Sequence, residues 1–450
     1  MPVKYITVTP LVNLFVPATR SFGDIAIIGA ISAGATGPKK VPIAITNPGA
    51  LSSSPVTTST SALTAAGSAT LNFAVVPATI RPGMSVLDMS HSGALAPNTS
   101  VVSTTATTVV MSQNALGAGV GSGDAIQFSN PNNGLPVDDP GWFQGPLGDS
   151  VKMAFAQSPS PTTVWAIATD PLDGASAVAN GLAEAAKLNV QIVALANMPL
   201  IGSGAGQGKA EIEALAAHCN TVSSTGGDGK ERIGVAMLGN GVTDTSLISA
   251  SMAQNRMTMV AHHSNSDAAC AMAGVIAGYA PHISLLLKPI SLDMDKVFSD
   301  SEIDAFNSAR VNWITRTPLL PGNGFYVGEG YTLGVDQPYI DIVRTIDEIS
   351  FALKAALIRS IGVLRVTRSG LRALVSEMSA VLQPLQDEAV IDSYTVFFPL
   401  LILLDKAPAS LSDIELQQIH NAQATRTVAS IATIEYAGAI ERLNITLSFE

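Results

Sequence analysis

The sequence predicts a multidomain protein of mixed α/β and α+β class, with a central α/β sheet domain, an inserted all-β module and a C-terminal helix-plus-strand domain. Three observations predict this architecture. Strand and helix patterns alternate through residues 163–262, only strand patterns occur in the charge-poor stretch 48–129, and a long helical periodicity begins near residue 339. A chain of 450 residues is long enough for about three domains of ordinary size.

The predicted domain boundaries follow these changes in pattern. Residues 1–47 are expected to form an N-terminal strand arm and the start of the α/β core, and residues 48–135 the inserted module. Residues 136–337 complete the central α/β domain, and residues 338–450 form the C-terminal domain.

Each segment contributes its own elements. Strand patterns in the module cover residues 69–76, 83–89 and 99–112, and its β-branched periodicity favours a folded module over a low-complexity linker. In the central domain, strands are expected at 163–170, 189–197, 232–238 and 257–262, with helices at 174–188 and 208–219. Apolar strands that alternate with helices predict a parallel sheet covered on both faces.

The C-terminal domain is predicted to contain two helices and a final strand. Apolar residues recur every three or four positions through 339–361, and a second helix is expected over 371–385. The chain finishes on an alternating segment whose apolar positions are Leu443, Ile445, Leu447 and Phe449.

The first residues alternate in the same way around Tyr5, Ile6 and Val8. Terminal strands fray unless a sheet holds them. We therefore expect both terminal strands to have partners, in this chain or in a neighbouring copy.

Composition and charge exclude several functions. Charged residues make up 13% of the chain, against about 25% in a typical soluble domain, whereas 47% of the residues are hydrophobic. This pairing is not that of a disordered chain, and it predicts that other protein covers part of the uncharged surface. The formal net charge of −11 argues against nucleic-acid binding, which needs a basic surface.

Cysteine content and apolar runs indicate a protein made in the cytosol. Cys219 and Cys270 are too few for a disulfide framework, and the first residues carry no signal-peptide pattern. The most apolar runs, 271–287 and 395–404, are interrupted or too short for a membrane span. Both are expected to be buried core.

No motif predicts a catalytic, cofactor or metal site. In the glycine-rich stretch 202–210, Ser203 and Ala210 replace residues that a phosphate-binding P-loop requires, so a flexible strand-to-helix loop is expected. None of the six histidines lies in a zinc motif, and adjacent His218 and Cys219 would point in different directions on a helix. The acidic pairs at 347–348 and 387–388 are interpreted as solvated helix faces or ends.

One cluster of basic residues is a candidate docking face. Between residues 349 and 376 there are five basic side chains and no acidic one: Lys354, Arg359, Arg365, Arg368 and Arg372. On a helix, the last three would share one stripe. A solvated helix surface is the alternative, unless the protein assembles around an acidic partner.

Several segments together resemble the sheath proteins of contractile phage tails and related contractile injection systems. The segment 271–290 looks like the exit from the sheath α/β domain, and 301–334 is similar to the strand-rich stretch before the helical region. Residues 340–357 resemble the long C-terminal helix, and 443–450 the final strand. The inserted module resembles the outward-facing decoration of many phage sheaths, and its residues 83–115 also look like a module seen in several virion proteins.

The resemblance implies a mechanical function. Sheath subunits stack as six-subunit rings around an inner tail tube and contract to drive that tube through the host envelope. Tyr5, Ile6, Val8 and the four apolar positions of 443–449 would then exchange strands between copies, and the five basic residues would face the tube. Implied partners are other sheath subunits, the tube, the baseplate and the tail terminator, with no nucleic acid or membrane.

The resemblance also implies a location in the virion tail, after assembly in the bacterial cytoplasm. Two alternatives remain: another virion component, such as a tube, baseplate or decoration protein, and an α/β nucleotide-binding enzyme.

Overall fold

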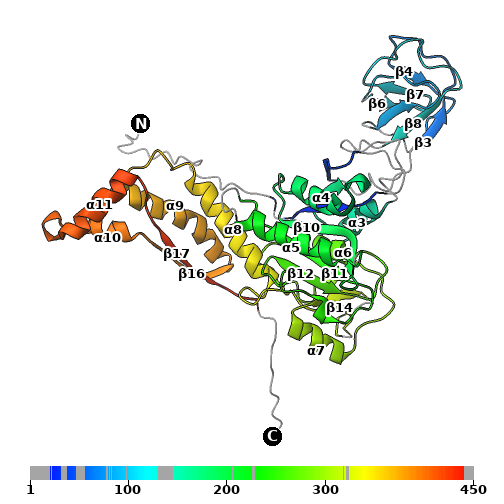
Figure 1. Ribbon diagram of the computed structural model, residues 1–450. Helices are drawn as coiled ribbons and strands as arrows, with labels where there is room; N and C mark the ends of the chain where they lie inside the picture. Colours follow the sequence, from blue (N-terminus) through cyan, green and yellow to red (C-terminus); the bar gives the residue numbers. More distant parts are fainter. Residues whose placement is uncertain are drawn as a thin grey trace, which may run out of the picture.

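The computed structural model describes residues 21–439, apart from residues 22, 32–37, 47–55, 78, 79, 81, 83, 98, 130–144, 205, 225–228, 318 and 321–323. Figure 1 shows a large central sheet flanked by helices and a small β module that stands apart from it. An arm of helices and two paired strands lies on the other side. This is the mixed multidomain α/β class predicted from the sequence. The domain boundaries themselves stay a prediction.

The central sheet has nine strands in the order β13-β15-β14-β12-β11-β10-β1-β9-β2. The run from β9 to β14 is parallel, whereas β2 and β15 pair antiparallel with their neighbours. The strands are β1 (Asp24–Gly29), β2 (Pro42–Ile45), β9 (Thr163–Ala168), β10 (Ile192–Leu200), β11 (Ile233–Leu238), β12 (Met257–Ala261), β13 (Pro289–Ile290), β14 (Asn312–Thr315) and β15 (Phe325–Val327).

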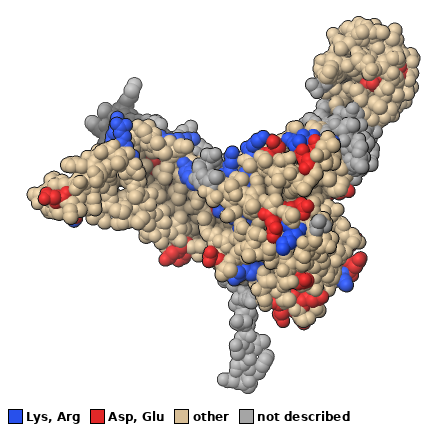
Figure 2. All heavy atoms as spheres, in the orientation of Figure 1, with Lys and Arg blue, Asp and Glu red and all other residues tan. Residues whose placement is uncertain are grey.

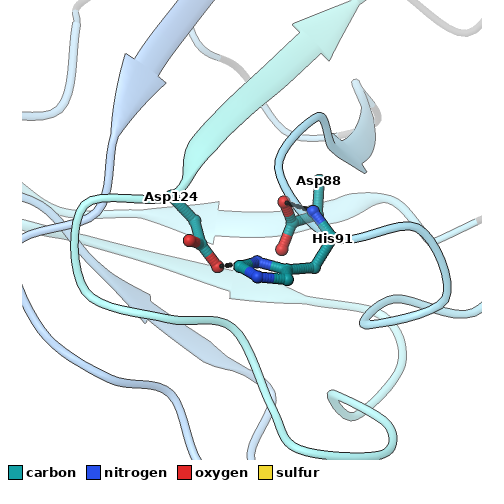
Figure 3. Close-up of side chains that lie close together, drawn as sticks. All are labelled: Asp88, His91 and Asp124. Atoms are coloured by element: carbon teal, nitrogen blue, oxygen red, sulfur yellow. Dashed lines mark hydrogen bonds and ion pairs between the residues drawn. The ribbon is translucent and has the colours of Figure 1, made fainter.

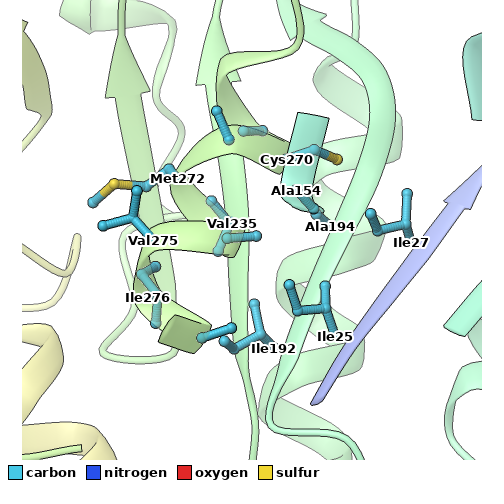
Figure 4. Close-up of a cluster of buried hydrophobic side chains, with 14 of the residues drawn as sticks. Ile25, Ile27, Ala154, Ile192, Ala194, Val235, Cys270, Met272, Val275 and Ile276 are labelled. Carbon is cyan, nitrogen blue, oxygen red and sulfur yellow. The ribbon is translucent and has the colours of Figure 1, made fainter. Parts of the chain in front are cut away.

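Helices cover both faces of this sheet, as the apolar strands require. One face packs against α3 (Pro146–Phe155) and α6 (Ala268–Gly278), and the other against α4 (Ala177–Ala185), α5 (Lys209–Ser224) and α7 (Asp300–Ala309). Figure 4 shows α6 over β1, β10 and β11, with its side chains packed onto Ile25, Ile192 and Val235.

Helix α6 is buried on every side, which explains its uniformly apolar sequence. It packs closely against α3 because Gly274 has no side chain. A Cβ atom there would lie 2.3 Å from the carbonyl oxygen of Ala154, which is closer than any real contact. The prediction that residues 271–287 form buried core is confirmed for this helix.

The β module consists of two three-stranded sheets that share one apolar core. One sheet has the order β3-β8-β5 and the other β4-β7-β6. Its strands are β3 (Val56–Ser59), β4 (Thr70–Asn72), β5 (Ser85–Asp88), β6 (Val101–Thr104), β7 (Thr108–Met111) and β8 (Ala125–Ser129). Phe73 and Phe128 meet edge to face in this core, with ring centroids 5.8 Å apart. The predicted runs 69–76 and 83–89 contain β4 and β5, the run 99–112 divides into β6 and β7, and β3 and β8 are additional.

The C-terminal arm, within the described residues, contains four α-helices and one pair of antiparallel strands. In chain order these are α8 (Ile340–Leu357), α9 (Arg368–Asp387), β16 (Ile391–Phe397), α10 (Pro399–Asp405), α11 (Asp413–Thr425) and β17 (Ile431–Tyr436), so α10 and α11 lie in the connection between the two strands. Both predicted helices are present. Helix α8 ends four residues before the expected position, and the chain then turns through Gly362, whose φ is +82°. Among the described residues, no helix is long and apolar enough to cross a bilayer.

One prediction for this arm was wrong. Residues 395–404 were expected to be buried core, but they divide between β16 and α10, and Phe398 is the one buried residue among them. The strand pair and the short helix α10 each present two faces, and within the described part of the chain only one of those faces has a layer packed against it. The other face leaves Phe397 and Ile402 42% and 50% exposed.

Candidate assembly interface

The two-stranded sheet of the C-terminal arm has unpaired outer edges in the described part of the chain. Strands β16 and β17 pair antiparallel from Ile391 opposite Tyr436 to Phe397 opposite Ile431. Within the described residues, neither strand pairs with a third one. A two-stranded sheet with free edges is marginally stable alone and offers unpaired backbone groups to another strand.

An apolar groove runs between this strand pair and helix α8. The groove has a volume of about 330 Å³. Its lining residues come from α8, from the start of β16 and from alternate positions of β17. They are Ile342, Thr345, Ile346, Ile349, Ser350, Leu353, Ile391, Ala432, Ile434 and Tyr436. Ile346 is 42% exposed on the rim, so the groove is open to solvent along α8.

Exposed apolar side chains are frequent throughout this arm. Figure 2 shows that much of its visible face is uncharged, whereas charged side chains gather over the central part. Beyond the groove, the large exposed residues are Ile358, Ile361, Val363, Phe397, Ile402, Ile414 and Ile431. Extended apolar surface of this kind marks contacts with other protein.

The end of the strand pair at which Ile391 lies opposite Tyr436 is tied to α8 and to the central domain through Tyr436. Its hydroxyl lies 2.7 Å from Oδ2 of Asp341 and 3.3 Å from the carbonyl oxygen of His282. Burial raises the pKa of the Asp341 carboxyl above its ordinary value, and the hydrogen bond from Tyr436 opposes that shift. These hydrogen bonds hold this end of the strand pair, and apolar side chains pack it against α8 and α9. The outer edges of both strands stay open in the described part of the chain.

Two ion pairs join α8 to the central domain, one largely buried and one with a partly exposed lysine. Arg256 forms a two-point contact with Asp347, in which Nη2 lies 2.8 Å from Oδ1, and Nζ of Lys354 lies 2.6 Å from Glu231. Asp347 was predicted to lie on a solvated helix face, but it is 6% exposed. The prediction was wrong because the pattern of α8 cannot show that Arg256, on a distant segment, approaches this side of the helix.

The three arginines that were predicted to share one helical stripe, Arg365, Arg368 and Arg372, are not all on a helix. Arg365 precedes the helix, because Thr367 caps α9 by accepting the N–H of Gly370, and α9 begins at Arg368. Arg368 and Arg372 do lie one turn apart, and both pair with Asp405 at 2.8 and 3.1 Å.

Of the other three basic residues, Lys354 is engaged with Glu231, whereas Arg359 and Arg365 are exposed in the connection between α8 and α9. Their role toward a tube stays a prediction. The predicted strand-exchange residues Tyr5, Ile6, Val8, Leu443, Ile445, Leu447 and Phe449 lie outside the described residues.

The glycine-rich loop after β10 is filled by its own side chain. Oε1 of Gln207 accepts the N–H of Gly204 at 2.9 Å and lies where a Cβ of Gly202 would be. Gly206 and Gly208 have positive φ, as expected for a tight strand-to-helix connection. The Gln207 side chain thus occupies the inside of this loop and takes up the N–H of Gly204.

A pocket of about 410 Å³ lies at the N-terminus of α6, between residues of α3 and Asn197 of β10. Its buried carboxylate, Asp267, accepts hydrogen bonds from the Ser150 hydroxyl at 2.6 Å and from the backbone N–H groups of Asn197 and Cys270 at 2.7 and 2.9 Å. Asp267 therefore joins α3, β10 and α6, which is a structural role.

The two thiols are core residues. Burial raises the pKa of Cys219 to about 12, and that of Cys270 well above its ordinary value. Burial also lowers the pKa of the neighbouring His218 to about 4. A thiol with so high a pKa is not a nucleophile at neutral pH.

No family model and no curated protein matches this sequence. Among solved structures, the chain is similar to the contracted helical sheath of the anti-feeding prophage, with 13% identity, a TM-score of 0.47 and coverage of 67% of this chain and 81% of that one. It is similar to the contracted sheath of the extracellular contractile injection system PVC, with 13% identity, a TM-score of 0.48 and coverage of 68% and 80%.

A third similar structure is the sheath tail protein of Listeria innocua, with 11% identity, a TM-score of 0.45 and coverage of 94% of this chain and 96% of that one. These structures belong to the class of protein that the sequence resembles, the sheaths of contractile tails and injection systems.

Proposed function

We propose that this chain is the subunit of a contractile tail sheath, which polymerises as stacked six-subunit rings around an inner tube and contracts to drive that tube through a host envelope. The observation that carries the proposal is the open β16–β17 sheet beside an apolar groove, in a chain whose two ends alternate like strands. The chain is then part of a tail, and its partners are other sheath subunits, the tube, the baseplate and the tail terminator.

The C-terminal segment of a neighbouring copy has the chemistry that the groove requires. A strand added to the free edge of β17 places alternate side chains on the inner face of the sheet, toward α8. Leu443, Ile445, Leu447 and Phe449 alternate with polar residues, so one face of that strand is wholly apolar. Such a strand would cover Ile346 and Ile434 and complete the sheet.

Strand addition suits a sheath because it joins subunits without fixing their mutual orientation. Main-chain hydrogen bonds hold the added strand, while the subunits rotate as bodies about the chain that leads to it. The buried Arg256–Asp347 pair supports this view, since it makes α8 and the central domain move as one.

Weak contacts with the tube follow from the same proposal. The contact must release on contraction, and exposed charge pairs of about 0–1 kcal/mol each meet that need. Arg359 and Arg365 have the exposure for this role. Arg368 and Arg372 already pair with Asp405, so a contact with the tube would have to compete with that ion pair.

The experiment is negative-stain electron microscopy of the purified chain and of a variant that lacks residues 443–450. We expect hollow cylinders of stacked rings from the full chain and folded, dispersed particles from the truncation. A matched control replaces Thr446 and Ser448 with Ala, which keeps the apolar face and should keep the cylinders. Normal cylinders from the truncation would contradict the proposal, as would a full chain that forms no cylinders even with its tube.

A further inference from the structure

The β module brings nearly all of its ionisable residues to one place. Between residues 48 and 129 the sequence contains four such side chains, Arg81, Asp88, His91 and Asp124. The last three converge at one end of the module, where β5 ends and β8 begins (Figure 3). A module that avoids charge elsewhere has therefore grouped two carboxylates with its single imidazole.

Short turns hold these three side chains in place. Oδ1 of Asp88 accepts the backbone N–H groups of Ser90 and His91 at 2.8 and 2.9 Å, which fixes the start of the turn that carries the imidazole. Oδ2 of Asp124 accepts the N–H of Gly121 at 2.5 Å and lies 3.0 Å from Nδ1 of His91. Gly121 has no side chain to keep the carboxylate away, since a Cβ there would lie 2.9 Å from both its oxygens.

One oxygen of the cluster has no hydrogen-bond partner among the described residues. Asp88 is 5% exposed, and its Oδ2 is buried and unpaired. Figure 3 shows the Asp88 carboxylate on one side of the His91 side chain and Asp124 on the other. An unpaired buried carboxylate oxygen is costly, and Asp124, itself 7% exposed, adds a second negative charge next to it.

We propose that Asp88, His91 and Asp124 form a binding site for a divalent transition-metal ion, Zn²⁺ by preference. Imidazole and carboxylate are both zinc ligands, and three protein ligands leave one tetrahedral position for water. The ion would supply the positive charge for the two carboxylates and the missing partner for Oδ2 of Asp88. The proposal does not depend on the sheath function.

The geometry requires only a small contraction. One ligand atom from each residue lies within 4.8 Å of the others. Two ligands of one zinc ion lie at most about 4 Å apart, because each bond is about 2 Å long. The His91 side chain is 65% exposed and can move inward, while the two carboxylates stay held by their backbone hydrogen bonds.

The bound ion would tie two turns of the module together. The turn that follows β5 carries His91, and the turn that precedes β8 carries Asp124. These three residues match no local zinc motif in the sequence. The only local signal is the spacing of Asp88 and His91, since Asp124 lies far along the chain.

The test is calorimetric titration of the full, chelator-treated chain with ZnCl₂ at pH 7. We expect one ion per chain with micromolar or tighter affinity, and at least a tenfold loss of affinity in His91→Gln and in Asp88→Asn. His420→Gln is the matched control, because that exposed histidine lies on α11 and should leave the titration unchanged. His91→Gln removes an exposed ring, so it tests the site even where Asp88→Asn disturbs the turn.

Titration with CoCl₂ gives a second readout, since visible absorption bands report on a nitrogen ligand and should disappear in His91→Gln. The proposal is overturned by no binding of Zn²⁺ at 100 µM, or by binding that His91→Gln leaves within twofold of the parent chain. Binding of Ca²⁺ that is insensitive to His91→Gln would also overturn it, because the imidazole would then be no ligand.

Discussion

Separating Arg256 from Asp347 should uncouple the C-terminal arm from the central domain. The pair is buried, with 20% and 8% of the two side chains exposed, and it joins the guanidinium to both carboxylate oxygens. Removing one partner of a buried pair costs about 3–5 kcal/mol, because the other charge is left without compensation. Since Arg256 retains some solvent contact, we expect Arg256→Met to lower the free energy of unfolding by about 2–4 kcal/mol.

The assay is a double-mutant cycle in urea, followed by tryptophan fluorescence. Trp165 and Trp313 lie in β9 and β14 of the central sheet, so they report on the domain that holds Arg256. With an m-value of about 2–3 kcal/mol/M, a loss of about 3 kcal/mol moves the urea midpoint by about 1 M. The double variant Arg256→Met with Asp347→Ala should lose less than the sum of the single variants, by about 1.5–3 kcal/mol.

An exposed pair provides the control for this cycle. Lys187 and Glu184 lie 2.7 Å apart on the surface, with the lysine side chain 68% exposed, and a coupling below about 0.5 kcal/mol is expected there. A coupling that small for Arg256 and Asp347 would refute the conclusion that this pair joins the arm to the central domain.

Three further predictions concern the thiols, a buried carboxyl and the basic connection. Cys219 and Cys270 should not react with a thiol reagent at pH 8 until the chain is denatured, and rapid labelling of the native chain would contradict their burial. Because the folded chain raises the pKa of Asp341 above 3.8, the parent chain should lose stability relative to Asp341→Asn as the pH rises from about 4 to 7; urea midpoints that show the opposite trend would contradict this sign. Arg359→Glu combined with Arg365→Glu should preserve folding and the sheath's own cylinders but reduce co-sedimentation with the tube; undiminished co-sedimentation would return both residues to a solvated surface.

The sequence predicts elements best where one physical effect dominates. Helix α6 and strands β10 and β11 are apolar almost throughout, and such segments are buried whichever neighbours they have. Strand β3, with the sequence VTTS, has no such signal, because it depends on pairing with the distant β8. Arg365 illustrates a local competition, since capping by Thr367 determines where α9 begins.

The candidate interface was harder to predict because its contacts join distant parts of the chain. Nothing in the periodicity of α8 reveals that Asp347 meets Arg256, or that Ile346 stays exposed on the rim of a groove. The segment 395–404 is informative in another way. Its apolar sequence predicts burial, but Phe398 alone is fully buried, and one side of the segment, with Phe397 and Ile402, stays exposed in the described part of the chain. Exposed apolar surface of this kind is expected where another subunit packs.

The central claim, that a neighbouring copy supplies a strand to the β16–β17 sheet, can be tested by disulfide trapping between copies. The background carries Cys219→Ser and Cys270→Ser, so that the introduced thiols are the only ones. One tagged copy then carries Ile346→Cys, and a differently tagged copy carries Leu447→Cys, which lies on the apolar face of the donated segment. Ser448→Cys, at the adjacent polar position, serves as the matched control.

The account predicts that Ile346→Cys and Leu447→Cys form a disulfide between the two differently tagged copies in assembled cylinders, and that Ile346→Cys with Ser448→Cys does not. A disulfide confined to single chains, or equal trapping at positions 447 and 448, would contradict strand donation.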